Sequence, residues 1–288
     1  MLARKGCSLR GRGGNLVHLL RWRHVFHYVT MTNVLATMTQ QDLLLPPMAR
    51  FAPRFVERLT SHLTPADRAD TRTALPQGSY LFHPGERNAD RCITLVASGV
   101  IALEYHSAAG RRSIFEVLSG GEFFGEETMV SIDGIYSPTA MSDSEVFQFD
   151  LDTFQDLLTT AGMTEDWNAL LVLKCLRLQT LVLQYGTMDC ECRLAMRLQS
   201  LAATLGEQRP TGTLIPLWIR HEDFGAMIGT TRSRVGYFLQ RFEESGIISR
   251  DGSLIEVHDR ALLRYLSERT GVALVARLRT KGSGPHWR

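Results

Sequence analysis

The side chains with the clearest chemistry lie between His221 and Arg241. Arg232 and Arg234 alternate there with hydroxyl-bearing residues, and no acidic side chain follows Asp223 until Glu243. An arginine guanidinium can hold a guanine edge through two hydrogen bonds, and arginines and hydroxyls also bind phosphate oxygens. The segment is therefore predicted to bind DNA.

Helices that enter the major groove contact bases mainly through their first turn. Arg232 and Ser233 are accordingly predicted to contact bases, and Arg234 to contact a base or a phosphate. The remaining predicted contacts are Thr231, Arg241 and His221 to phosphate, and Tyr237 to either group.

These side chains need two helices joined by a tight turn, and the spacing supplies one. Gly225 is small where the helices must approach, and Gly229 suits a turn residue with positive φ. Either Thr230 or Thr231 can cap the second helix. Apolar residues then fill the space between the helices, namely Phe224, Ile228, Val235 and Phe238. An ordinary helical hairpin would explain the apolar positions but not the two glycines in register.

A hairpin is predicted directly after this unit. Asp251-Gly252 separates the apolar runs beginning at Ile247 and Leu254, which is a strong two-strand signal. It would form a wing beside the second helix, with Arg250 and Ser253 near a phosphate backbone. The polar segment 206–213 before the unit is expected to be a loop.

The elements upstream divide into strands and helices. Short apolar runs between Leu75 and Leu151 alternate with glycine-bearing turns, which predicts an antiparallel barrel or sandwich. Short helices are expected before it, with Thr64 as a cap and Pro65 in the first turn. Residues 165–185 and 192–205 are expected to form helices.

The helix over 165–185 carries two apolar stripes, so both of its sides should be covered. One stripe is predicted to be a parallel dimer seam, although an internal core helix would show the same pattern. The seam residues are Leu171, Cys175, Leu178, Val182 and Tyr185. The second stripe contains Leu173, Leu176, Thr180 and Leu183.

The composition indicates a globular protein and excludes some classes of function. The chain has 288 residues, a net charge of +2 and 44% hydrophobic residues, which suits a globular two-domain protein. No apolar run reaches the roughly 18 residues that a membrane helix needs. The acid-free stretch 1–41 is interpreted as a flexible basic extension rather than a targeting peptide, with Met31 or Met38 as alternative starts, and 269–288 as a basic tail. Five unpatterned cysteines suit a reducing cytoplasm.

No catalytic set, phosphate loop or complete metal motif is present in the sequence, so an enzyme is not expected. Cys190 and Cys192 resemble only half of a metal site, and no metal is expected.

Taken together, these segments resemble the cyclic-AMP receptor protein and fumarate-nitrate regulator (Crp/Fnr) superfamily of transcription regulators. The resemblance covers about Leu75 to Leu266, and its specific pieces are the stretches 120–126 and 229–235. It implies an α+β protein with four parts: a cyclic-nucleotide-binding-like β-barrel of the jelly-roll type at 42–162, a dimerisation helix at 163–187, a winged helix-turn-helix at 188–268, and the tail. It also implies a homodimer on a palindromic DNA operator and contact with RNA polymerase.

The effector is where the chain departs from the family. Cyclic-nucleotide binders of this family have a Gly-Glu pair at the ribose and, about ten residues on, an arginine followed by Ser or Thr at the phosphate. Gly125-Glu126 matches the pair, but 133–139 contains no basic residue. Tyr136 and Ser137 complete the effector-pocket candidates. A buried anionic phosphate without a cation is poorly compensated, so cyclic AMP is disfavoured as a cofactor.

Other members carry iron–sulfur clusters or haem. Cys7 and Cys92 cannot supply four ligands for a cluster, and His83, Cys92 and His106 would be the haem ligands. We therefore expect an unidentified signal rather than an iron–sulfur cluster or haem. The alternative function is a cyclic-nucleotide-sensing regulatory module that does not act on DNA. The missing arginine and the arginine-rich helix both oppose it.

Overall fold

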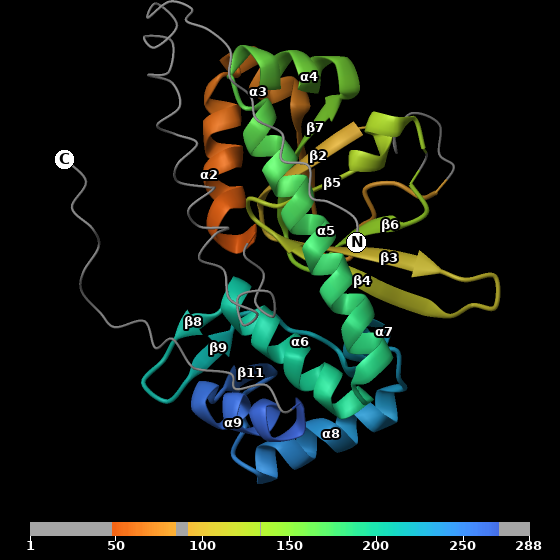
Figure 1. The fold of residues 1–288 in the computed structure, drawn as a ribbon, viewed down its shortest axis with the longest axis vertical. Helices are drawn as coiled ribbons and strands as arrows, with labels where there is room; N and C mark the ends of the chain where they lie inside the picture. Colours follow the sequence, from red (N-terminus) through yellow and green to blue (C-terminus); the bar gives the residue numbers. More distant parts are fainter. Residues whose placement is uncertain (1–47, 85–91, 133, 271–288) are drawn as a thin grey trace, which may run out of the picture. The chain divides into compact units, whose positions relative to one another are not determined.

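The computed structural model describes residues 48–84, 92–132 and 134–270, all within the unit Thr39–Arg288 (Figure 1). The predicted basic extension, 1–41, and residues 271–288 of the predicted tail lie outside these residues.

Two helices precede the strands, α2 (Met48–Ser61) and α3 (Pro65–Thr71). The predicted cap of α3 is confirmed. The Thr64 hydroxyl accepts the backbone N–H of Asp67, and the Asp67 carboxylate accepts the N–H of Thr64. This reciprocal pair satisfies two N–H groups that a helix start leaves open.

The strands that precede α4 form two antiparallel sheets. One has the order β1-β7-β2-β5 and the other β4-β3-β6. Their bounds are β1 (Arg72–Leu75), β2 (Cys92–Ser98), β3 (Val100–His106), β4 (Arg112–Ser119), β5 (Phe123–Phe124), β6 (Ser137–Ala140) and β7 (Ser144–Asp150), with a 3-10 helix, η2 (Glu126–Val130), after β5.

Of the predicted antiparallel barrel or sandwich, the described residues form the sandwich, and their strands do not close into a barrel. Val96 and Val146 from the first sheet share one buried cluster with Ile101 and Leu118 from the second. Closure needs strands that pair around the whole ring. The edge strands β5 and β6 have only 2 and 4 residues, too few to join the sheets along their lengths.

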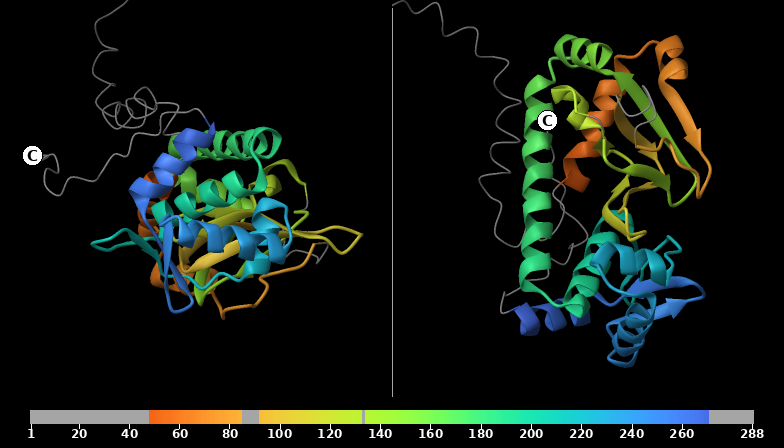
Figure 2. Two further views of the ribbon diagram at one scale, coloured as in Figure 1. Left: turned by 90° about the horizontal axis from the view of Figure 1, so that it is seen from below. Right: turned by 90° about the vertical axis from the view of Figure 1, so that its right-hand side faces the viewer.

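Three helices follow the sandwich, α4 (Leu151–Thr160), α5 (Thr164–Thr187) and α6 (Cys190–Leu205). Asp150 caps α4 and Asp189 caps α6. The 24-residue α5 starts beside the sandwich and ends near α7 (Figure 2). Trp167 anchors its first turns, because its ring lies 4.4 Å from that of Phe123 and 4.9 Å from that of Phe154.

The C-terminal part is a winged helix-turn-helix. It contains β8 (Glu207–Gln208), β9 (Thr213–Ile215), α7 (His221–Ile228), α8 (Arg232–Glu244), β10 (Ile248–Asp251), β11 (Leu254–Val257) and α9 (Asp259–Thr270). The predicted hairpin is β10-β11, with Asp251 opposite Leu254. The loop expected over 206–213 is partly wrong, because β8 and β9 pair and extend the wing sheet in the order β10-β11-β9-β8. The exposed two-residue β8 has no apolar alternation that could reveal it.

The two parts share a core. Val100, Ala102 and Ile114 of the sandwich belong to the same buried cluster as Phe224 and Met227 of α7. No helix in the described part of the chain is long and apolar enough to span a membrane.

Candidate nucleic-acid interface

The turn between α7 and α8 has the geometry that its glycines predict. Gly229 ends α7 in the left-handed region, with φ 68° and ψ 45°. A Cβ on Gly225 would lie 2.8 Å from the Thr230 carbonyl oxygen, so only glycine lets the turn approach α7 this closely. Thr231 is the cap of α8, since its hydroxyl accepts the Arg234 N–H at 3.4 Å.

The space between the two helices is filled as expected. Phe224, Ile228, Val235 and Phe238 are all buried. His221 lies at the start of α7, and its ring would be 3.4 Å from a Cβ on Gly236 of α8. This close packing leaves one face of α8 for the solvent.

That outward face carries the predicted base contacts. The Arg232 side chain is 73% exposed, and its Nε lies 3.1 Å from Glu222 Oε1 on α7. Ser233 and Arg234 are exposed, with the Arg234 guanidinium 5.7 Å from the Phe238 ring centroid. Tyr237 is exposed as well. The arginines therefore point away from the core, as a groove-reading helix requires.

The predicted phosphate contacts differ in how free they are. Arg241 Nη1 lies 3.1 Å from Glu191 Oε2 on α6, and its guanidinium stands over the Tyr237 ring. His221 is half-buried. Part of the Arg241 charge is thus already compensated within the chain, whereas Thr231 is exposed at the helix start.

A cleft of about 380 Å³ opens between the helix starts and the wing. Its lining includes Trp218, Arg220, Arg232, Arg250 and Ser253. The sequence predicted Arg250 and Ser253 near phosphates, but Trp218 and Arg220 were not among the predicted DNA contacts. Their signal is the alternation over 215–220, where buried Ile215, Leu217 and Ile219 separate exposed residues.

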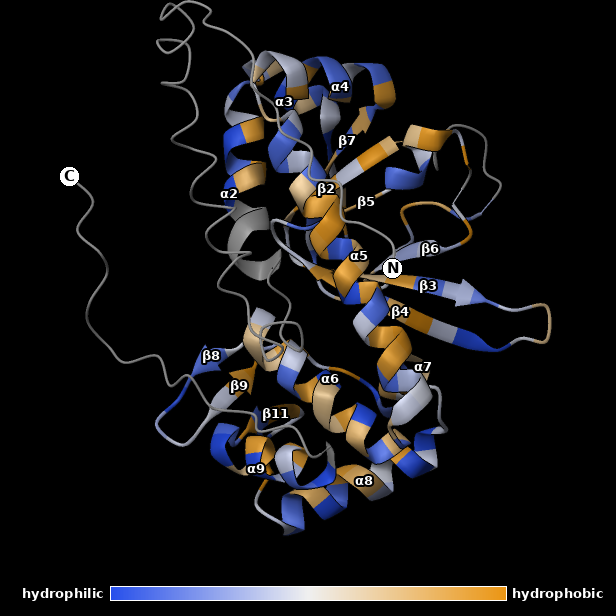
Figure 3. Cartoon of the chain, viewed as in Figure 1, coloured by the Kyte–Doolittle hydropathy of each residue, from blue (hydrophilic) through white to orange (hydrophobic). Residues whose placement is uncertain are grey.

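Helix α5 has apolar segments along much of its length (Figure 3), and most of the predicted seam residues are exposed on it. Cys175, Leu178 and Val182 are exposed, Val182 to 71%, whereas Leu171 is half-buried. The open apolar face also includes Val172 and Leu183, which the predicted stripe omits.

Tyr185 differs from the other seam residues. Its hydroxyl donates to the Met227 carbonyl oxygen at 2.5 Å, and the Arg193 guanidinium stands 4.8 Å from its ring centroid. Tyr185 thus joins the end of α5 to the end of α7. Leu173 of the second stripe is buried, but Leu183 of that stripe is exposed.

The structure brings two of the four effector-pocket candidates together. Gly125, with φ 90°, would place a Cβ 2.1 Å from the Cys92 carbonyl oxygen. Its N–H donates to the Tyr136 hydroxyl at 3.1 Å. The Tyr136 ring packs among Phe82, Phe115 and Phe124. Burial and the neighbouring Glu127 carboxylate raise the pKa of Tyr136 above its ordinary value, so the phenol is neutral.

The other two candidates are engaged elsewhere. Glu126 Oε1 lies 2.6 Å from Lys174 Nζ on α5, and the Ser137 hydroxyl lies 3.4 Å from His83 Nδ1. Lys174 is buried and also lies 3.3 Å from Glu116 Oε2.

Lys174 belongs to a buried charge cluster that sequence reasoning missed. Arg177 of α5 pairs with Glu116 of β4, and at 2.5 Å with Glu122. Burial alone would raise the pKa of Glu116, but Arg177 and Lys174 outweigh it and hold that pKa below its ordinary value. Helix α5 is therefore bound to the sandwich through charges as well as through Trp167.

These residues do not fit a cyclic nucleotide. Ten positions after Glu126, where an arginine would be needed, Tyr136 is buried among aromatic rings. Among the described residues, Glu126 pairs with Lys174, which also pairs with Glu116. Within the described part of the chain, no group of three or more His, Cys, Asp and Glu side chains could hold a metal ion.

Comparisons with known proteins agree with this architecture. Residues 72–161 match a cyclic nucleotide-binding domain model, and residues 192–266 match a Crp-like helix-turn-helix domain model. The chain is 26% identical to the cyclic AMP receptor protein of Thermus thermophilus over 198 residues, 68% of this chain and 88% of the relative. It is 27% identical to the cAMP-activated global transcriptional regulator CRP of Pasteurella multocida over 187 residues, 64% and 88% respectively.

A solved structure shows the same fold. The chain aligns with a CooA mutant from Carboxydothermus hydrogenoformans at a TM-score of 0.55 and 24% identity, covering 68% of this chain and 87% of that one. A sandwich of the cyclic-nucleotide-binding type, followed by a long helix and a winged helix-turn-helix, defines a class of transcription regulators. The chain belongs to the Crp/Fnr superfamily within that class.

Proposed function

We propose that this transcription regulator acts as a homodimer that reads a two-fold symmetric DNA operator through α8. The observation that carries this proposal is the outward face of α8, where Arg232, Ser233 and Arg234 are exposed on the first turn. A palindromic operator matches a two-fold protein, with half-sites about one helical turn of DNA apart.

The apolar face of α5 supports the dimer. Val172, Val182 and Leu183 are more than half exposed to solvent in the single chain. A second copy of α5 laid parallel to the first would cover them, as in a two-stranded coiled coil. The wing cleft supports DNA binding in the same way, because Arg250 and Ser253 line it beside Arg232.

The signal that modulates this regulator enters through the sandwich and is not cyclic AMP. The named relatives respond to or bind that nucleotide, but Tyr136 fills the position where a phosphate-binding arginine would be needed. RNA polymerase contact and a cytoplasmic location complete the proposal, both on the strength of the family and of action on DNA.

Sequence-selective binding tests the function. The wild-type chain should enrich a palindromic duplex from a random-sequence pool, with an affinity that falls as salt rises. Arg232→Ala should weaken that binding by about 1 to 3 kcal/mol and relax base choice at one position of each half-site. Affinities measured by fluorescence anisotropy on duplexes varied at each position give both quantities.

Two further variants make the result specific. Arg264→Ala removes an exposed arginine of α9, away from the α8 face, and should bind like the wild type. Arg241→Ala should weaken all duplexes similarly and flatten the salt dependence, because a phosphate contact carries no base information. If the wild type enriched no sequence from the pool, the proposed function would be wrong. If Arg232→Ala kept the base choice of the wild type, Arg232 would not be a base contact.

A further inference from the structure

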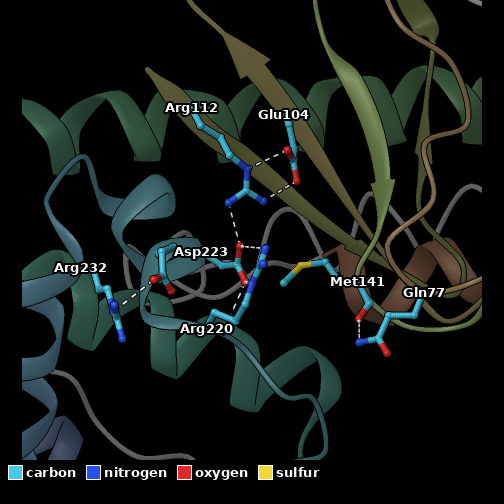
Figure 4. A network of polar contacts seen from close by, with 8 residues as sticks. Gln77, Glu104, Arg112, Met141, Arg220, Asp223 and Arg232 are labelled. Atoms are coloured by element: carbon cyan, nitrogen blue, oxygen red, sulfur yellow. Dashed lines mark hydrogen bonds and ion pairs between the residues drawn. The ribbon is translucent and has the colours of Figure 1, made fainter. Parts of the chain in front are cut away.

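An ion network around Arg112 joins the sandwich to the DNA-binding domain (Figure 4). The Arg112 guanidinium, from β4, donates to both oxygens of Glu104 on β3, at 2.8 and 2.5 Å. Its remaining Nη1 lies 2.7 Å from Asp223 Oδ1 on α7, 111 residues along the chain. One guanidinium thus binds a carboxylate on each side of the domain boundary.

The network is shielded from solvent on its acidic side. The Glu104 side chain is 1% exposed and that of Asp223 is 7% exposed, while Arg112 is 26% exposed. Charge-assisted hydrogen bonds in such surroundings are stronger than surface pairs, because water competes less for the charges. The geometry also matters. The rigid fork of an arginine fixes the direction of each partner, which the single ammonium of a lysine would not do.

Asp223 ties this contact to the structure of α7. Its carboxylate accepts the Arg220 backbone N–H at 3.2 Å and so caps the helix, and it also accepts the Arg220 guanidinium. The side chain that meets Arg112 is therefore held rigidly to the first turn of α7. Apolar packing surrounds the same boundary, because Ile114 of β4 and Phe224 of α7 belong to one buried cluster.

The helix that receives this contact also contacts the DNA-reading side chain. Glu222, next to Asp223, lies 3.1 Å from Arg232 at the start of α8. The helix start therefore has Arg112 on one side and Arg232 on the other, as Figure 4 shows. A shift of α7 relative to β4 would move both contacts.

We propose that Arg112 is a positioning residue for DNA binding, which holds α7, and with it α8, in a fixed orientation on the sandwich through Asp223. The inference rests on the proposed DNA-binding function. Its physical basis is pre-organisation: a reading helix held in one orientation loses less conformational freedom when it binds. The β3-β4 pair thereby becomes a route between the sensory sandwich and the DNA-reading helix, separate from α5.

Arg112→Gln tests the proposal with Arg111→Gln as the matched control. Arg111 is the neighbouring arginine, and its side chain is exposed. On the operator duplex selected by the wild type, at one salt concentration, Arg112→Gln should bind about tenfold more weakly. Arg111→Gln should stay within about twofold of the wild type, as expected for an exposed charge.

Hydrogen exchange by mass spectrometry supplies a readout that does not need DNA. Amides of α7 and of the β3-β4 pair should exchange faster in Arg112→Gln, while those of β2 and β7 should not change. If Arg112 only stabilised the sandwich, amides throughout the sandwich would exchange faster in Arg112→Gln. That result would overturn the proposal.

Asp223→Asn is the second variant, because Arg112→Gln leaves Glu104 buried without its arginine. The Asp223→Asn variant keeps a side-chain carbonyl oxygen that can cap α7, and it keeps both hydrogen bonds between Arg112 and Glu104. It removes only the negative charge at position 223, on the DNA-binding side. It should reproduce the weaker binding and the local exchange. Unchanged exchange at α7 in both variants, or tighter DNA binding, would overturn the proposal. Failure of the wild type to select any duplex would reject the proposed function instead, and the exchange data would still decide the role of Arg112.

Discussion

Tyr136 decides, at the scale of a single residue, what the sandwich can bind. Its hydroxyl satisfies the Gly125 N–H, and its ring occupies space among three phenylalanines. Segment 133–139, which contains Tyr136, has no basic residue, so a cyclic nucleotide bound there would place a phosphate anion without an arginine to bind it. The segment therefore has a buried aromatic ring and no cation where the family pattern expects a phosphate-binding arginine.

We therefore expect no saturable binding of cyclic AMP to the wild-type chain. Isothermal titration calorimetry measures this directly, and the Thermus thermophilus cyclic AMP receptor protein serves as the positive control. The expected result is heat from the control protein and only dilution heat from this chain. A stoichiometric binding isotherm for the wild type would mean that Tyr136 moves aside, and the assignment of a different signal would be wrong.

Helix α5 shows how one element serves two interfaces. Lys174 and Arg177 face the sandwich and pair with its buried carboxylates. Val172, Val182 and Leu183 face solvent. The first face fixes the helix on its own chain, so the second face is presented in a defined direction to a partner.

Val182→Asp should convert the proposed dimer into monomers, because the charge would be buried within the seam. Sedimentation velocity at several protein concentrations measures the change. Thr187→Asp adds the same charge to the same helix at another exposed position and should leave the dimer intact. If Val182→Asp sediments as the wild type does, α5 does not form the seam.

Buried ion pairs occur both at α7, through Asp223, and in the sandwich, through Glu116. They make the stability of the whole molecule depend on pH. Burial alone would raise the pKa of Asp223, but hydrogen bonds from Arg220 and Arg112 hold that pKa below its ordinary value, and the pKa of Glu116 is lowered by Arg177 and Lys174 against its own burial. A carboxylate whose pKa is lower in the folded state stabilises the fold above its unfolded pKa of about 4. That stabilisation is lost as the pH falls through the folded pKa.

The free energy of unfolding in urea should thus fall steeply below about pH 4, where these carboxylates begin to take up protons. Asp223→Asn should lower the stability at neutral pH by about 1.5 to 3 kcal/mol, the range for a charged hydrogen bond, and should flatten the acid dependence. Asp156→Asn is the control, because it changes an exposed carboxylate on α4 and should retain the wild-type slope. Asp143→Asn would not serve, because the Asp143 carboxylate accepts the Gln77 backbone N–H. An equal acid slope in Asp223→Asn and the wild type would contradict this prediction.

Several features could be predicted from the sequence because they depend on neighbours along the chain. The turn at Gly229, the caps at Thr64 and Thr231 and the hairpin at Asp251-Gly252 each follow from the conformational preference of one or two residues. The exposure of Arg232 follows in turn, since Arg232 is the first residue of α8, directly after the Thr231 cap and before the first buried residue of that helix, Val235.

Other features were decided only by the tertiary structure. The sequence did not determine whether the short strands close into a barrel, because closure depends on how edge strands of 2 and 4 residues meet across the sandwich. It also could not pair Arg112 with Asp223, or Arg177 with Glu116, since these partners are 111 and 61 residues apart. Local patterns state which side chains are charged or apolar, but a contact between distant segments depends on the packing of the whole chain, which brings those segments together.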